Sequence, residues 1–183
     1  MDNFAGYARY APVYLPRVSQ SGLRLAVPSL LIALAVPVSP AKAERILEPL
    51  RFFEGRTEML SLVKVMMKKP YQSRTVGRGR ILADGSLSLV QQIHDRGKPA
   101  SKRHWLIREV SPGRFTGSMS EAVGPVSVQQ IGGKFLFRFR MKGKLAIEQW
   151  LTPLPGGKAA SSKVTVKKFG MRVASSEGTI RKF

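Results

Sequence analysis

The chain of 183 residues carries 31 Lys and Arg against 11 Asp and Glu, a formal net charge of +20, and 43% of its residues are hydrophobic. This hydrophobic content excludes global disorder, the length suits one domain, and the charge favours a polyanionic partner such as nucleic acid, anionic lipid or a phosphorylated glycan. Because the chain has no cysteine, disulfides, thiol catalysis, cysteine-ligated metal and a lipid-modified N-terminal cysteine are all excluded.

The N-terminal segment has the pattern of a secretory signal. Three arginines against one acid precede an apolar run over residues 25–38, and small residues then form an A-x-A pattern that ends at Ala43. The run is too short to span a membrane and contains Pro28 and Pro37, although an uncleaved anchor or a buried core helix would also contain an apolar run. We therefore expect residues 1–43 to be a signal peptide, cleaved after Ala43, that exports a soluble protein to the periplasm.

The signal affects how the charge is interpreted. Its length of 43 residues exceeds the usual range of roughly 15–30, which suggests that translation begins near Val18. Residues 1–43 hold four of the 31 cations and one of the 11 acids, so residues 44–183 keep 27 cations and 10 acids, a net charge of +17. The charge therefore belongs to the folded domain. Because an exported protein rarely meets a chromosome, nucleic acid is not the expected partner.

Residues 44–183 contain short segments with period-two patterning between turn signals. A helical or irregular lead-in is expected at 45–53, and a turn of helix at 168–173. The turn signals lie at 84–85, 96–101, 111–113, 132–133, 142–143 and 155–157, and the alternating segments at 87–94, 104–108, 126–129, 135–142, 145–151 and 163–167. About eight to ten strands with hairpin-short connections predict one all-β domain, an antiparallel up-and-down β-barrel, because closure removes exposed strand edges.

The segment 59–69, MLSLVKVMMKK, differs from the others because its apolar residues lie on both faces. One interpretation is a strand buried on both sides, or a strand that leads into a short helix. The other is an adaptable apolar lining or a membrane-touching lip, because methionine conforms to varied partners.

The segment 133–144, GKFLFRFRMKGK, could belong to a nucleic-acid surface or to a barrel wall. A nucleic-acid sheet needs aromatic and basic groups on the same face, whereas successive side chains of a strand point to opposite faces. One face would carry Phe135, Phe137, Phe139 and Met141, and the other Leu136, Arg138, Arg140 and Lys142. The segment therefore predicts a barrel strand with its aromatic residues inward and its cations outward.

The hairpin tip at 96–103 is a candidate rim for an anionic head group. Its cations are Arg96, Lys98, Lys102 and Arg103. Together with Lys68, Lys69 and Arg74 they could surround one mouth of the barrel and bind a phosphate or carboxylate, provided that these loops lie at the same end. The alternative is that these cations only provide solubility and edge protection.

The two histidines, His94 and His104, flank this tip and would lie roughly opposite each other in a symmetric hairpin. With Asp95 as a third ligand they could start a metal site. Neighbouring Lys and Arg residues disfavour a divalent cation, so no metal is expected.

The acids give no sign of catalysis. Glu109, Glu121 and Glu148 could converge in space, but their spacing matches no paired-carboxylate motif. No nucleophile–base pair, metal set or cofactor motif is present, so we expect no catalytic residue, no cofactor and no enzymatic activity.

Short motifs in a fixed order resemble an uncharacterised proteobacterial envelope family. They are FFEG at 52–55, RHWLIRE at 103–109, GRFTG at 113–117, SEAVGPV at 120–126 and KFG at 168–170. From about residue 47 to its C-terminus the chain is similar to domain of unknown function 3833, a family of secreted proteins and lipoproteins. The resemblance implies a lipocalin-like barrel in the envelope and no catalytic residue. The chain departs from the family in lacking the lipobox cysteine, and in carrying Glu121 one position before the place where many relatives have an Asp.

Two functions follow from these features. The first is non-catalytic binding of a small apolar or lipid-like ligand with an anionic head group inside the barrel, which a cavity of roughly several hundred Å³ would favour and a filled interior would not. Its lining would be Trp105, Phe115, Met119, Phe135, Phe137, Phe139 and Met141. The alternative is a structural or interaction protein that binds an anionic envelope polymer or a membrane surface, as a peripheral contact, through its basic exterior.

Overall fold

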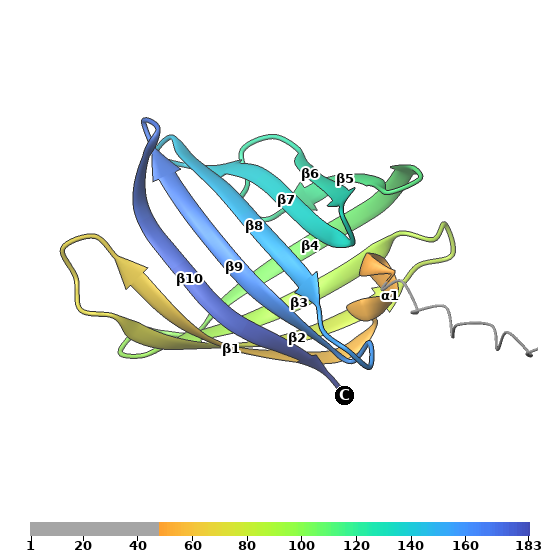
Figure 1. The fold of residues 1–183 in the computed structure, drawn as a ribbon, viewed down its shortest axis with the longest axis horizontal. Helices are drawn as coiled ribbons and strands as arrows, with labels where there is room; N and C mark the ends of the chain where they lie inside the picture. Colours follow the sequence, from red (N-terminus) through yellow and green to blue (C-terminus); the bar gives the residue numbers. More distant parts are fainter. Residues whose placement is uncertain (1–47) are drawn as a thin grey trace, which may run out of the picture. The chain divides into compact units, whose positions relative to one another are not determined.

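The computed structural model describes residues 48–183, and the expected signal peptide with its cleavage site lies outside these residues. One short helix is followed by ten strands (Figure 1). They are α1 (Pro49–Phe52), β1 (Gly55–Val65), β2 (Tyr71–Ile81), β3 (Leu87–Asp95), β4 (Ser101–Ser111), β5 (Arg114–Met119), β6 (Val126–Ile131), β7 (Lys134–Met141), β8 (Leu145–Pro153), β9 (Ala159–Lys168) and β10 (Met171–Lys182).

The strands form a closed antiparallel barrel in meander order. Each strand pairs with its neighbours in the chain, and β1 pairs with β10 from Thr57 opposite Lys182 to Val65 opposite Ala174. This confirms the predicted up-and-down barrel, with a strand number at the upper end of the expected range. Because closure pairs both edges, residues 48–183 leave no strand edge open, and the barrel is a self-contained unit.

The side chains alternate between a buried interior and a charged exterior, as expected for strands with one wet face. On β7, Phe135, Phe137 and Phe139 are buried in the core, whereas Arg138 and Arg140 are exposed. The prediction of aromatic residues inward and cations outward is therefore confirmed for this strand.

The helix α1 lies at one end of the barrel (Figure 1). Phe52 and Phe53 are buried there and meet edge to face, with ring centroids 5.1 Å apart. The prediction of a lead-in before the first strand is confirmed for its described part. The opposite end of the barrel is formed by the hairpins β1–β2, β3–β4, β5–β6, β7–β8 and β9–β10, and we call it the mouth.

Two local expectations were wrong. On β1 the outward side chains of Leu60 and Leu62 are 63% and 43% exposed, so this strand is not buried on both faces, because no second layer packs against it. The expected turn of helix at 168–173 is instead a hairpin, in which Phe169 and Gly170 connect β9 to β10. No helix within residues 48–183 is long and apolar enough to cross a membrane.

Candidate functional site

The interior changes along the barrel axis from closed to open. Inward side chains near α1, such as Leu87, Phe135 and Leu151, are fully buried. Inward side chains near the mouth, such as Val63 and Ile93, are only half-buried. The interior is therefore reached from the mouth and closed by α1.

A chamber lies between these two ends. It is lined by Pro49, Leu50, Phe53, Thr57, Met59, Thr75, Gly77, Leu89, Gln91, Trp105, Ile107, Phe115, Val128, Phe137, Gln149, Leu151 and Ile180. The space between atoms amounts to about 640 Å³, part of it continuous with solvent, but the centre of a water-sized sphere can reach only about 40 Å³. The smaller volume decides what fits: the chamber is a narrow gap that admits a few waters or a slender chain, and not a bulky ring system.

The chamber has an apolar wall and a polar wall. Trp105, Phe115 and Phe137 belong to the apolar wall, and Thr57 and Thr75 to the polar wall. The polar wall depends on a glycine, because a Cβ on Gly77 would come within 2.5 Å of the Thr57 hydroxyl oxygen. A ligand in the chamber would therefore meet aromatic carbon on one side and hydroxyl groups on the other.

Two glutamines that the sequence analysis missed also line the chamber. The Trp105 indole Nε1 donates to Gln91 Oε1 at 2.8 Å, and Gln149 Nε2 donates to Ser162 Oγ at 3.0 Å. A signal for Gln91 was present in the sequence, because it falls in phase with the inward Leu87 and Leu89 of the same strand. These bonds fix the side chains that would orient polar atoms of a ligand.

The seven expected lining residues all point inward, but they divide into two groups. Trp105, Phe115 and Phe137 line the chamber. The others belong to the core or pack against it: Met119, Phe135, Phe139 and Met141. The Phe139 ring meets the Trp105 ring edge to face at a centroid distance of 5.5 Å, so it supports the chamber wall.

The expected cation rim does lie at the mouth, on the β3–β4 hairpin, and at the same end as Lys68 and Lys69. Two of its four cations are already bound by acids. Lys98 Nζ lies 3.0 Å from Asp95 Oδ2, and Arg103 donates to Glu121 Oε2 from Nε and Nη2 at 2.9 and 2.7 Å. Arg103 is paired in register with the inward Gln91, so its guanidinium faces the inside of the mouth.

The remaining rim cations differ in their surroundings. Arg96 and Lys102 are exposed, and neither has an acidic partner within residues 48–183. Arg74 lies on the outer face, where its Nε donates to Glu58 Oε1 at 2.6 Å. This bond lowers the pKa of Glu58 and raises the pKa of Arg74, so Arg74 is not a free rim cation.

Asp95 organises one side of the mouth. Burial alone would raise the pKa of Asp95, but hydrogen bonds from Ser73, Lys98 and Tyr71 outweigh it and hold that pKa below its usual value. Bonds to Tyr71 and Asp95 raise the pKa of Lys98, whose Nζ lies 4.5 Å from the centre of the Tyr71 ring. Both groups are therefore charged at neutral pH and tied to each other.

The candidate metal ligands and acids are not brought together. His94 pairs in register with Arg74, and His104 with Val90, so the two histidines do not face each other as expected. Residues 48–183 contain no group of three or more His, Asp or Glu side chains that could hold a metal. The three glutamates have separate partners: Glu109 accepts from the Gly113 amide, Glu121 binds Arg103, and Glu148 binds Arg138 and Lys167.

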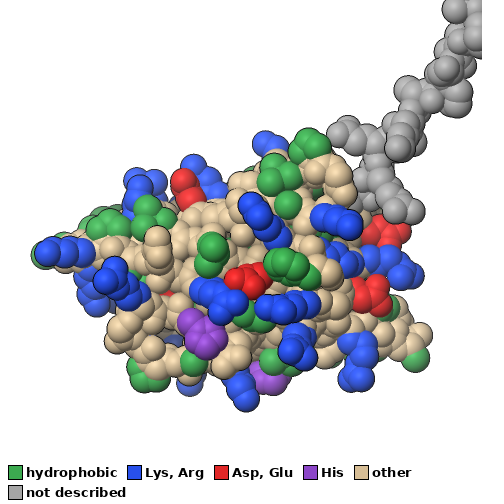
Figure 2. Space-filling view, turned by 90° about the horizontal axis from the view of Figure 1, so that it is seen from below, with side chains coloured by type: hydrophobic (Ala, Val, Ile, Leu, Met, Phe, Trp, Pro, Cys, Tyr) green, Lys and Arg blue, Asp and Glu red, His purple; other side chains and the backbone are tan. Residues whose placement is uncertain are grey.

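A second, open groove lies on the outer face of β1, β2 and β3, and its space between atoms, which includes open solvent, amounts to about 1140 Å³. Its lining includes Leu60, Leu62, Arg74, His94 and Arg96. Figure 2 shows Lys and Arg side chains interleaved with apolar ones over the face seen from below.

Solved structures share this barrel at low sequence identity. The S-type phycobiliprotein lyase CPES from Guillardia theta has a TM-score of 0.61 at 11% identity, over 78% of this chain and 98% of the lyase. Rv2717c from M. tuberculosis has a TM-score of 0.57 at 11% identity, over 76% of this chain and 98% of its own. A DUF3598 protein of unknown function from Nostoc punctiforme has a TM-score of 0.55 at 10% identity, over 75% of this chain and 50% of its own.

These likenesses establish a calycin-like, that is lipocalin-like, β-barrel and nothing finer. No family model and no curated protein matches the chain. The resemblance to domain of unknown function 3833 is therefore not confirmed.

Proposed function

We propose that this protein is a non-catalytic binding protein that holds a slender, lipid-like ligand in the chamber, with an anionic head group at the mouth. The observation that carries the proposal is the gradient of the interior, which is sealed at α1 and half-exposed at the mouth. A chain entering from the mouth would pass Arg103 before it reaches the aromatic wall. Closed barrels of about eight strands have interiors that side chains fill or that hold one small ligand, and the ten strands of this barrel leave at least as much room.

The narrow chamber restricts the class of ligand. Only about 40 Å³ is open to the centre of a water-sized sphere, so a single alkyl chain is favoured over a fused-ring or tetrapyrrole ligand. A longer chain would have to displace a flexible side chain, and Met59 on the chamber lining is the one best suited to move.

The test is calorimetric titration of the chain that begins at Glu44 with saturated fatty acids of increasing length. Affinity should rise roughly fourfold per CH₂ until the chamber is full, because each buried CH₂ contributes about 0.8 kcal/mol. Thr75→Leu adds apolar bulk to the chamber, so less of the alkyl chain can be buried. The affinity should fall roughly tenfold, which corresponds to the loss of one to two buried CH₂ groups. The matched variant Thr165→Leu on the outward side of β9 should bind normally. Affinity that ignores chain length would contradict the proposal.

We also propose that the protein acts in the periplasm as a member of domain of unknown function 3833. The ordered motifs from FFEG to KFG and the N-terminal signal pattern support this assignment. N-terminal sequencing of the protein recovered from a periplasmic extract should begin at Glu44. An uncleaved N-terminus in that fraction would contradict the signal assignment and would leave the barrel proposal unaffected.

The outer groove favours a second candidate, binding of an anionic envelope polymer. Arg96, which has no acidic partner within residues 48–183, lies there with the exposed Leu60 and Leu62, although Asp95 and Glu177 also line the groove. Binding of this kind would be abolished by salt, because exposed charges are screened within a Debye length of about 8 Å at physiological ionic strength. Capture of a soluble anionic polysaccharide that disappears in high salt, together with no fatty-acid binding, would favour this candidate over the first.

A further inference from the structure

Two adjacent hairpins at the mouth expose large apolar side chains at their tips. Met66 and Met67 on the β1–β2 hairpin are 59% and 97% exposed, and Phe169 and Met171 at the β9–β10 hairpin are 69% and 65% exposed. The hairpins lie side by side, because β1 pairs with β10 and the Met66 amide donates to the Val173 carbonyl at 2.9 Å. Such a cluster of exposed apolar tips marks an interaction surface.

The same end of the barrel is strongly positive. The neighbouring β7–β8 hairpin joins this cluster, because Leu145 of β8 pairs with Lys168 of β9. The three hairpins carry Lys68, Lys69, Lys142, Lys144, Lys168 and Arg172. No acid lies on these three tips, and within residues 48–183 none of the six cations forms an ion pair.

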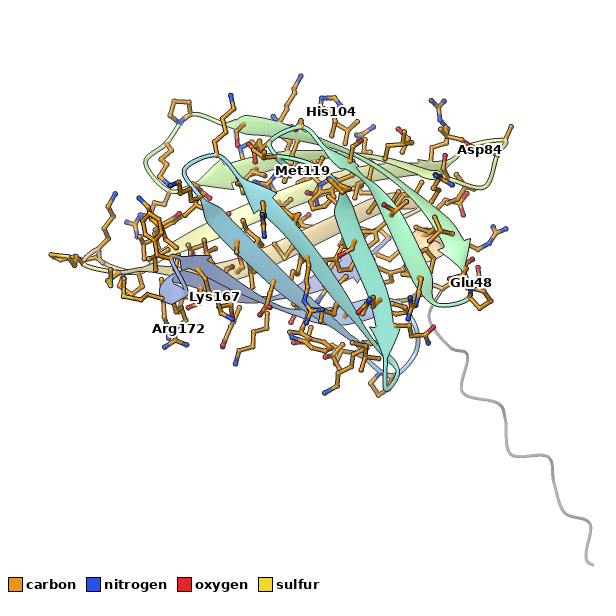
Figure 3. The ribbon with its side chains drawn as sticks, turned by 90° about the horizontal axis from the view of Figure 1, so that it is seen from above. Glu48, Asp84, His104, Met119, Lys167 and Arg172 are labelled. Atoms are coloured by element: carbon orange, nitrogen blue, oxygen red, sulfur yellow. The ribbon has the colours of Figure 1, made fainter. Side chains whose placement is uncertain are left out.

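The acids of the mouth lie on other hairpins, where Asp95 binds Lys98 and Glu121 binds Arg103. Figure 3 shows Arg172 and Lys167 at the mouth end and Glu48 and Asp84 at the other. In Figure 2 the hairpin that projects on the left carries Lys or Arg and apolar side chains. Unpaired cations are therefore concentrated on the three hairpins that also expose the apolar tips.

The backbone at the same three tips is unusual. Among residues 48–183 the only residues other than glycine with positive φ are Met67 at 62°, Lys144 at 61° and Phe169 at 50°. Each lies at the tip of one of these hairpins, where Gly or Asn would be favoured. Strained residues of this kind gather where a side chain is needed for binding. Lys144 and Lys168 also hold their Nζ atoms 5.5 and 5.7 Å from the Phe169 ring centre.

We propose that these three hairpins dock the barrel, mouth first, on an anionic phospholipid bilayer. Met67 and Phe169 enter the headgroup region, and the surrounding lysines bind lipid phosphates. A soluble polyanion would meet the cations but would leave the apolar tips in water, so the combination favours a lipid surface. The inference does not depend on the chamber ligand, because every residue in it lies on the exterior.

The absence of native cysteine allows a clean test of orientation on the chain that begins at Glu44. The variants Met67→Cys, at the mouth, and Ile131→Cys, at the α1 end, each carry one environment-sensitive fluorophore. With vesicles of phosphatidylcholine and phosphatidylglycerol, the label at position 67 should brighten and shift to the blue, and the label at position 131 should not change. With phosphatidylcholine alone neither label should respond. Equal responses from both labels, or no response from either, would overturn the proposal.

A substitution of Phe169, which has a positive φ, distinguishes a role of this side chain in vesicle binding from a role in stability. Phe169→Asn places a favoured residue in the left-handed turn, so it should keep or raise thermal stability while weakening vesicle binding several-fold. Phe183→Asn, at the exposed C-terminus at the other end, should leave binding unchanged.

Charge is tested in the same way. Lys68→Gln with Lys69→Gln should weaken vesicle binding at least tenfold, since each lysine near an anionic surface contributes about one factor of five. The matched pair Lys134→Gln with Lys158→Gln, near the α1 end, should not. Normal binding by the Phe169 variant, or equal losses from the two lysine pairs, would show that the mouth is not the docking end. Calorimetric titration of the same variants with fatty acids tests the chamber proposal separately, so the failure of one proposal can be distinguished from the failure of the other.

Discussion

At the scale of single residues, contacts decide which charges at the mouth are free. Lys98 and Arg103 belong to the cation-rich hairpin that the sequence singles out, yet both are bound by acids. The acid that binds Lys98 is local, because Asp95 lies three residues earlier in the same hairpin, whereas Glu121 lies 18 residues from Arg103 and Tyr71 lies 24 residues from Asp95. Sequence spacing gives no sign of the two distant contacts, which exist only because the barrel brings neighbouring hairpins together. The rim available to a head group is therefore smaller than the hairpin's composition suggests.

Asp95→Asn should lower the free energy of unfolding at neutral pH by about 1 kcal/mol, because Lys98 is half exposed and its pair with Asp95 is partly screened. The pKa of Asp95 is depressed in the folded state, so its contribution is present above its ordinary value of 3.8 and is lost as the pH falls through the folded value. The pKa of Lys98 is raised, so its contribution is present below its ordinary value of 10.5 and is lost as the pH rises above it.

Urea unfolding of the parent and the Asp95 variant across pH measures this difference. The two proteins should converge as the pH falls below 3.8. Glu177→Gln, which removes an ion pair with both partners 64% exposed, should have a smaller effect at neutral pH. A gap between parent and Asp95→Asn that persists in acid would show that the aspartate acts through packing.

At the scale of elements, the helix α1 depends on the barrel for its existence. Four residues are too few to form a stable helix alone, and α1 is held by the burial of Phe52 and Phe53. The residue that follows α1 packs directly on Gly79 of β2, because a Cβ added to Gly79 would collide with the Phe53 carbonyl oxygen. The closed end of the chamber is thus determined by a residue with no side chain.

Gly79→Ala should destabilise the protein by about 1–3 kcal/mol, the usual cost of overpacking, and should loosen α1 first. Gly85→Ala is the control, because its Cβ would meet nothing and only the positive φ of 79° is strained, at about 1 kcal/mol. Hydrogen exchange of the Phe52 and Phe53 amides, which bond to the Glu48 and Leu50 carbonyls, reports on the helix. Unchanged protection of these amides in Gly79→Ala would show that α1 does not rest on this contact.

The sequence predicts the strands of this fold better than its tips and its polar lining. Alternation places Phe135, Phe137 and Phe139 inside correctly, because a wet and a dry face leave a period-two signal. The same reasoning fails for Leu60 and Leu62, whose exposure depends on the absence of a covering layer. The hairpin turn at Phe169 is also not predicted from the sequence, because a phenylalanine in the left-handed region contradicts local turn preferences.

At the scale of the whole molecule, the net charge is unevenly distributed. The nine ion pairs within residues 48–183 include few cations of the mouth, so repulsion concentrates at that end. Composition predicts the excess of cations but not its polarity, because meander order decides which hairpins share an end. Three apolar hairpin tips that carry six cations and no acid give the barrel a preferred orientation at an anionic surface, because the end near α1 carries acids as well as cations.

Raising ionic strength from a few millimolar to about 150 mM should raise the melting temperature of the barrel, because salt screens self-repulsion more than it weakens exposed ion pairs. The variant that combines Lys68→Gln with Lys69→Gln should show a smaller rise. Calorimetric scans at matched pH measure both. A melting temperature that falls with salt would mean that the ion pairs outweigh the repulsion.

The single closing seam between β1 and β10 has a consequence for how the chain reaches this fold. Every other pairing joins strands that follow one another and can form locally as a hairpin. The seam instead joins Thr57 to Lys182, across almost the whole domain. Loop-closure entropy is therefore concentrated in one late event. Until that event the two edge strands are unprotected and can pair with other chains. The interval between the first hairpins and the closing of the seam is when this protein is most prone to aggregate.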